Sequence, residues 1–190
     1  MSQWFRQGGR RCSPLNAALA DKHYHTSWSE LMVSKKELCS LYEEVLVKLI
    51  EQNNENMRFY VQQKAFSHMT LSIAFWHDDL YWNIWNKDGS KFNEHPKDSH
   101  YEFIIHCVGD EKDEASAKLR GIYADWADTD DVFTPFIKLS HEALAAALKT
   151  EVVKNKLISI LYENSSFKAV NYNDVIHVED PDGEFKFNFM

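Results

Sequence analysis

The tetrapeptide His68-Met69-Thr70-Leu71 combines side chains suited to acid–base chemistry with the spacing of a β-strand. Alternate residues of a strand lie on the same face, so His68 and Thr70 share one face while Met69 and Leu71 face the core. An imidazole can accept or donate a proton near neutral pH, and a neighbouring hydroxyl can bind a phosphate oxygen. Residues 66–76 therefore predict a strand with a polar face on which acid–base chemistry is geometrically permitted.

The order His-apolar-Thr-apolar resembles the unit that occurs twice, in facing pairs, in the two-histidine phosphoesterases. The resemblance implies that His68 is an acid or base and that Thr70 binds phosphate. The chain offers only His25-Thr26-Ser27 as a second unit, and a threonine stands there at the apolar position. With 20 serines and threonines and 9 histidines in 190 residues, about one His-x-Ser/Thr is expected by chance. These observations favour an ordinary half-buried strand.

An enzymatic alternative depends on which strands are neighbours. If the strand around His106 neighbours the strand around His68, one register places Glu102 and Thr70 on the same face as both histidines, and the sequence does not fix that register. Two imidazoles and a carboxylate can form a general base or a divalent metal site. This alternative is a small histidine-dependent hydrolase, phosphoesterase-like or metal-dependent. Polar residues on a solvated sheet face explain the same pattern, and the sequence predicts neither a bound metal nor a cofactor.

Aromatic side chains are unusually dense in residues 80–85, "LYWNIW". Leu80, Trp82 and Ile84 share one strand face, while Tyr81 and Trp85 share the other. A single layer of helices cannot easily bury both faces, and aromatic side chains supply much of the contact area in interfaces. We therefore predict that Tyr81 and Trp85 form a partner-binding patch, unless the rest of the chain folds over them.

Acidic residues form a second candidate contact surface in residues 125–131, "DWADTDD". The carboxylates expected to meet basic residues of a partner are those of Asp125, Asp128, Asp130 and Asp131. The segment lacks the glycine and terminal glutamate of a calcium loop, so the alternative is a solvated turn.

Charge and composition narrow the class of protein. Hydrophobic residues make up 44% of the chain, which is enough for a core. The net charge is −8, with +3 in residues 1–40 and therefore −11 in the remainder, which disfavours nucleic acid and suits a basic partner protein. Three scattered cysteines are typical of a reducing compartment. Apolar runs are too short to span a membrane, and no apolar stretch follows the N-terminal arginines, so we expect a cytoplasmic location.

The order of the elements predicts an α+β fold: a single domain over 27–190, preceded by an irregular, partly flexible arm over 1–26. A capping box at Ser34–Glu37 begins an amphipathic helix that runs to about residue 53. Residues 57–63, "MRFYVQQ", alternate like a strand, and Asp88-Gly89 predicts a hairpin turn. Further elements are a strand in "HYEFIIHCV", a helix capped by Ser140, and a C-terminal hairpin around Pro181-Asp182-Gly183. We expect a mostly antiparallel sheet built from hairpins and covered by about three helices on one face.

No catalytic motif extends over the chain, which favours a non-enzymatic role. The sequence predicts a cytoplasmic protein-binding protein that occludes a surface of its partner, as an inhibitor, an immunity-type protein or an adaptor. The hydrolase centred on His68 remains the alternative.

Overall fold

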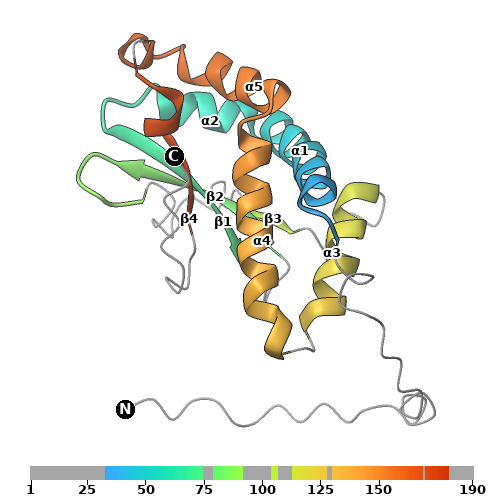
Figure 1. Ribbon diagram of the computed structural model, residues 1–190. Coiled ribbons are helices and arrows are strands. Elements are labelled where there is room, and N and C mark those ends of the chain that lie inside the picture. The colour runs from blue at the N-terminus through green and yellow to red at the C-terminus, as the bar shows by residue number, and fades with distance from the viewer. Residues whose placement is uncertain are drawn as a thin grey trace, which may run out of the picture. The chain divides into compact units, whose positions relative to one another are not determined.

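The computed structural model describes residues 33–74, 79–91, 104–106, 113–127, 130–168 and 170–179 (Figure 1). The chain divides into two units, 1–32 and 33–190, and every described residue belongs to the second. The arm expected over 1–26 and the hairpin expected around Pro181-Asp182-Gly183 lie outside the described residues. The α-helices are α1 (Lys35–Gln52), α2 (Asn54–Val61), α3 (Glu114–Ala127), α4 (Asp130–Leu148) and α5 (Glu151–Leu161). The strands are β1 (Phe66–Ala74), β2 (Asp79–Asn86), β3 (Ile104–His106) and β4 (Ile176–Glu179), with two short 3-10 helices, η4 (Ser165–Phe167) and η5 (Tyr172–Asp174).

The fold is α+β, and its described strands form one sheet in the order β3-β2-β1-β4. β1 pairs antiparallel with β2, and β2 pairs antiparallel with β3. β4 pairs parallel with β1, so the sheet is mixed, and this parallel pairing was not expected from the sequence. The described residues contain five α-helices, more than the three expected. Among them, no helix has both the length and the apolar composition that crossing a bilayer requires.

Helix α1 begins where the sequence predicts. The Ser34 hydroxyl accepts a hydrogen bond from the Glu37 backbone N–H (3.1 Å), which satisfies a donor that the first turn leaves unpaired. The apolar face of α1 is fully buried in the core through Leu38, Leu41, Tyr42, Val45, Leu46, Leu49 and Ile50. The amphipathic helix predicted from the capping box is confirmed.

Residues 57–61 are helical, so the strand predicted for "MRFYVQQ" is wrong. Met57, Tyr60 and Val61 are buried, which is the i, i+3, i+4 spacing of a helix face. A strand would place Phe59 on the same face as Met57 and Val61, yet 53% of Phe59 is exposed. A short window satisfies both periods, and tertiary burial decided between them.

The region around the predicted acidic loop is also more helical than expected. α3 continues to Ala127 and α4 begins at Asp130, so only two residues separate them. Tyr123 and Phe136 pack edge to face across this connection, with ring centroids 5.7 Å apart. Ser140 lies inside α4 and is fully buried, so it does not cap a helix as predicted. This aromatic contact stabilises the helical form of both segments near their connection.

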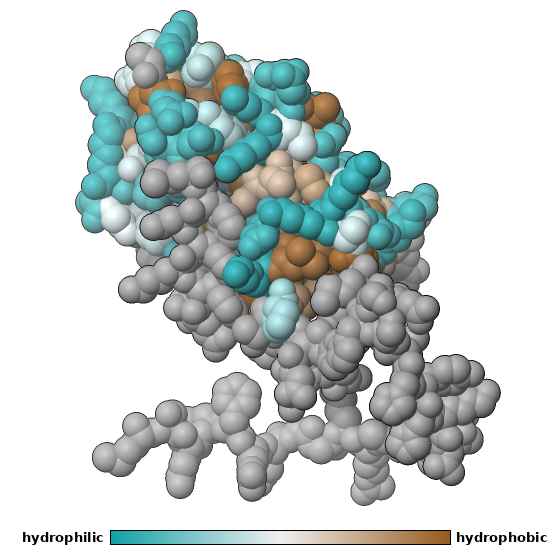
Figure 2. Space-filling view, viewed as in Figure 1, coloured by the Kyte–Doolittle hydropathy of each residue, from teal (hydrophilic) through white to brown (hydrophobic). Residues whose placement is uncertain are grey.

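The hairpin turn at the end of β2 is confirmed. Gly89 adopts a φ of 84°, which favours glycine, and Trp85 and Lys91 form an antiparallel bridge across the turn. In β1, Met69, Leu71 and Ile73 are buried in the same core cluster as the helices, as the alternation predicts. Figure 2 shows that the described surface on the viewed side is mostly hydrophilic, with apolar residues in small separate areas.

Candidate functional site

Two histidines meet on the polar face of the sheet. The parallel register places Thr70 of β1 opposite His177 of β4, and Ser72 opposite Glu179. His68 lies two residues before Thr70 on β1, so it is diagonally opposite His177 on the neighbouring strand. The two rings pack edge to face with centroids 5.5 Å apart. The pairing of β1 with β4 therefore assembles a histidine pair from residues far apart in the sequence.

A chain of hydrogen bonds crosses three strands beside this pair. The indole N–H of Trp85 donates to Thr70 Oγ1 (2.9 Å), and the Thr70 hydroxyl donates to Glu179 Oε2 (2.7 Å). The proton of Thr70 is therefore used within the protein, and Thr70 is only 6% exposed. In this arrangement Thr70 orients Trp85, and its hydroxyl proton is not available to a ligand as the phosphoesterase resemblance implied.

Trp85 in turn holds the ring of His68. The two rings are stacked with an interplanar angle of 9° and centroids 5.7 Å apart. His68 Nδ1 lies 3.0 Å from the Ser67 hydroxyl, and within the described part of the chain Nε2 of His68 has no hydrogen-bond partner. When Nδ1–H donates to Ser67, the lone pair of Nε2 is available as a base.

His177 is held through its other nitrogen. Its Nε2 lies 3.2 Å from the carbonyl oxygen of Asp174, which can only accept, so Nε2–H donates. In this tautomer Nδ1 carries the lone pair. His68 and His177 thus each use one ring nitrogen in a hydrogen bond that orients the ring.

Burial lowers the pKa of His68 below the usual value of 6.5. The neighbouring His177 lowers the pKa further, because two protonated imidazoles repel, while the Glu179 carboxylate raises it by a smaller amount. At neutral pH, His68 is therefore predominantly neutral and able to accept a proton.

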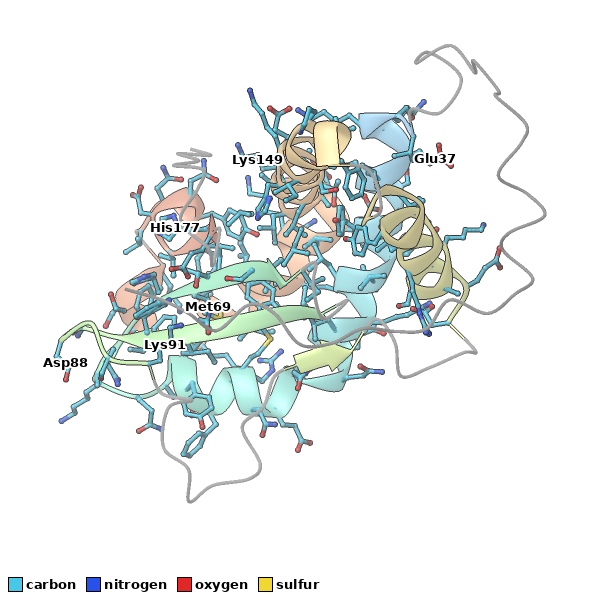
Figure 3. All side chains as sticks on the ribbon, turned by 90° about the horizontal axis from the view of Figure 1, so that it is seen from below. Glu37, Met69, Asp88, Lys91, Lys149 and His177 are labelled. Atoms are coloured by element: carbon cyan, nitrogen blue, oxygen red, sulfur yellow. The ribbon has the colours of Figure 1, made fainter. Side chains whose placement is uncertain are left out.

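A cation completes the surroundings of Trp85. The ammonium of Lys91 lies 4.9 Å from the centroid of the Trp85 ring, a cation–π distance. In Figure 3, Lys91 and His177 lie toward the end of the sheet that carries Asp88 at the hairpin tip, away from Glu37 on α1. The group formed by His68, Thr70, Trp85, Lys91, His177 and Glu179 is called the histidine site below.

Metal binding finds no support in the described ranges. Within them, no three His, Cys, Asp or Glu side chains lie close enough together to hold one metal ion. The histidine site offers two imidazoles, but its carboxylate already accepts the Thr70 hydroxyl. Its two imidazoles are side chains that can accept or donate a proton near neutral pH.

The pairing of the strands around His68 and His106, on which the sequence alternative depended, is wrong. β2 lies between β1 and β3, and His106 pairs with Asp79, which pairs with Ala74. Ala74 is six residues from His68 along β1, a separation of about 20 Å in a strand. Of the four predicted catalytic residues, His68 and Thr70 lie on the same face of β1, and Glu102 lies outside the described residues.

Of the predicted partner-binding residues, the structure describes the side chain of Trp85. Trp85 is half-buried, because it stacks on His68 and donates to Thr70. Tyr81 pairs with Ser72 in the backbone of the sheet, and its side chain is outside the described part. Asp125 belongs to α3, Asp130 and Asp131 belong to α4, with side chains that are not described, and Asp128 lies between the two helices, outside the described residues. Their role in partner binding stays a prediction.

His177, Glu179 and Lys91 were missed at the level of sequence. The His-x-Ser/Thr requirement passed over His177-Val178-Glu179, where a carboxylate stands in the place of the hydroxyl. The repeated order His-apolar-acceptor in two strands was the available signal. Lys91 carried no local signal, because only the Asp88-Gly89 turn brings it back over Trp85.

Comparisons of the chain with protein-family models, with curated proteins and with solved structures gave no match.

The lowered pKa of His68 makes stability depend on pH. A histidine with a lowered folded pKa stabilises the fold above the unfolded value of 6.5, and this contribution is lost as the pH falls toward the folded pKa. We expect the urea-derived free energy of unfolding to fall between about pH 7.5 and about pH 5.5. His68→Gln should have a shallower dependence over this window, and an equal or steeper one would contradict the burial of a neutral imidazole.

Proposed function

We propose that this protein is a histidine-dependent hydrolase of phosphoesters, with His68 as general base and His177 as general acid. The edge-to-face contact of these two imidazoles at 5.5 Å is the observation that carries the proposal. A base and an acid of the same side-chain type work together when their surroundings separate their protonation states. The burial that keeps His68 neutral supports this division of roles.

The reaction requires one proton on the histidine pair. Neutral His68 takes a proton from water at Nε2 while the water oxygen attacks phosphorus. Protonated His177 gives its Nδ1 proton to the leaving oxygen as the phosphorus–oxygen bond breaks. The products are an alcohol and a phosphate with one ester group fewer. His68 then releases its proton to solvent and His177 takes one up, which restores the starting pair.

The charges of the histidine site favour a phosphodiester over a monoester. In the reactive form, Lys91 and the one proton on the histidine pair contribute two positive charges, and Glu179 contributes one negative charge. The balance of one positive charge complements the single negative charge of a diester. A monoester carries nearly two charges at neutral pH, and the second would face the Glu179 carboxylate without a partner.

The test is hydrolysis of bis(4-nitrophenyl) phosphate by the purified full chain. His68→Ala should lower the rate by about 100-fold or more, because it removes the general base. His177→Ala should lower it less, because 4-nitrophenolate can leave without being protonated. His106→Ala is the matched control and should retain the rate. His106 lies on β3, level with Ala74, which is six residues from His68 along β1. The wild-type rate should decrease as the pH falls below the usual histidine value, because His68 then becomes protonated.

Two outcomes contradict the hydrolase. One is a wild-type rate no faster than the rate without protein, and the other is unchanged hydrolysis by the His68→Ala variant. Thermal unfolding of each variant must accompany the rates, so that loss of fold is not mistaken for loss of chemistry.

Protein binding is the second candidate function, and exposed aromatic side chains favour it. Phe59 of α2 is 53% exposed, and Tyr162 after α5 is 40% exposed. Aromatic side chains are enriched among the residues that dominate binding energy in interfaces, and the negative charge of the chain suits a basic partner. Occlusion of a partner surface, as by an inhibitor, immunity-type protein or adaptor in the cytoplasm, would combine these features with Tyr81, Trp85 and the acidic residues of 125–131.

This candidate is tested by affinity capture from lysate, followed by binding measurements with the purified partner. Trp85→Ala should weaken binding by about tenfold or more if Trp85 lies at the centre of the interface. Phe59→Ala is measured beside it to test whether the exposed aromatic side chain on α2 also contributes to binding. Binding that neither variant weakens would contradict a role for these aromatic side chains.

A further inference from the structure

A hollow of about 590 Å³ lies between the turn after α2, the hairpin that follows β2, and the segment around η4. This volume is within the range of small-molecule sites. Its lining residues include none of the histidine site: Gln62, Gln63, Lys64, Phe66, Lys87, Glu163, Asn164, Ser165, Ser166 and Phe167. Any ligand of this hollow would therefore be recognised separately from the chemistry of the two histidines.

The apolar part of the hollow is aromatic. Phe66 and Phe167 pack edge to face with ring centroids 5.0 Å apart. Phe66 is buried in the core, while Phe167 is half-buried at its margin. Phe66 therefore supports the Phe167 ring, and Phe167 offers the apolar surface against which a flat group can pack.

Hydrogen bonds hold the polar walls in place. The Asn164 side chain donates to the Val61 carbonyl (2.8 Å) and accepts from the Ser166 backbone N–H (3.0 Å), which ties η4 to the end of α2. The Lys87 ammonium donates to the Lys64 carbonyl (2.8 Å), which ties the hairpin to the turn after α2. A site whose walls are already ordered loses less entropy when a ligand binds.

The hollow carries a net positive charge in an acidic protein. Lys64 and Lys87 contribute two ammonium groups, and among the described residues neither has a carboxylate partner. Glu163 also lines the hollow, but it forms an ion pair with Arg58 and accepts a hydrogen bond from Gln62. The hydroxyls of Ser165 and Ser166 lie on the same lining and can donate to an anion.

We propose that this hollow binds a small organic anion with a flat apolar body. The body packs against Phe167, and the anionic group, of the carboxylate type, lies between Lys64 and Lys87 with the serine hydroxyls beside it. Two exposed ammonium groups give modest affinity, and the Phe167 ring supplies selectivity for flat molecules.

The probe is 2-naphthoate, and the neutral 2-naphthamide of nearly the same shape is its comparison. Backbone amide chemical shifts of the full chain should move saturably at Gln63, Ser165 and Ser166 with 2-naphthoate, and much less with the amide. Lys64→Gln and Lys87→Gln should each weaken 2-naphthoate by about three- to fivefold, because each removes one charge. Lys91→Gln, in the histidine site, is the matched control and should bind as wild type does.

Phe167→Ala should weaken binding as well, and the lysine variants keep the test valid if this variant fails to fold. Equal binding of 2-naphthoate and 2-naphthamide would overturn the anion preference. The absence of saturable shifts at these three amides would overturn the site. Neither outcome affects the proposed hydrolysis, because His68 and His177 take no part in this hollow.

Discussion

The parallel pairing of β4 with β1 is the contact on which both the core and the histidine site depend. Met69 lies opposite Ile176 and Leu71 opposite Val178, and all four side chains are buried in the core. Because strand residues alternate, the same register turns His68, Thr70, His177 and Glu179 to the other face. A shift of this register by one residue would bury the polar side chains and expose the apolar ones. The register of β1 and β4 therefore specifies both the core and the histidine site.

Burying the polar groups of this face costs free energy, which their hydrogen bonds offset. Thr70, Ser72 and Asn83 are nearly inaccessible to solvent, and each takes part in a hydrogen bond between strands. The His68 imidazole gains no strong partner for its protonated form, so burial leaves it preferring the neutral form. A purely structural face would be served as well by apolar residues, and a desolvated histidine beside another is the kind of arrangement found at functional sites.

Local signals in the sequence predicted local structure well. The Ser34 cap, the alternation in 66–73 and the glycine at the Asp88-Gly89 turn each act within a few residues, and each was confirmed. The site was not predictable in the same way, because Thr70 and Glu179 are 109 residues apart. Parallel strands are also not joined by a short turn, so no local sequence signal indicates their pairing. Residues 57–61 fit two periods, and only burial of Tyr60 against the core distinguished the helix.

The most direct test is an NMR titration of the imidazole signals of His68 and His177 in the full chain. If the two form one site, His68 titrates below 6.5, its pKa rises in His177→Gln, and it falls further in Glu179→Gln. These opposite responses follow from removing a repelling neighbour and an attracting one. A His68 that titrates at its usual value and responds to neither substitution would contradict the pairing of β4 with β1 and the site built on it.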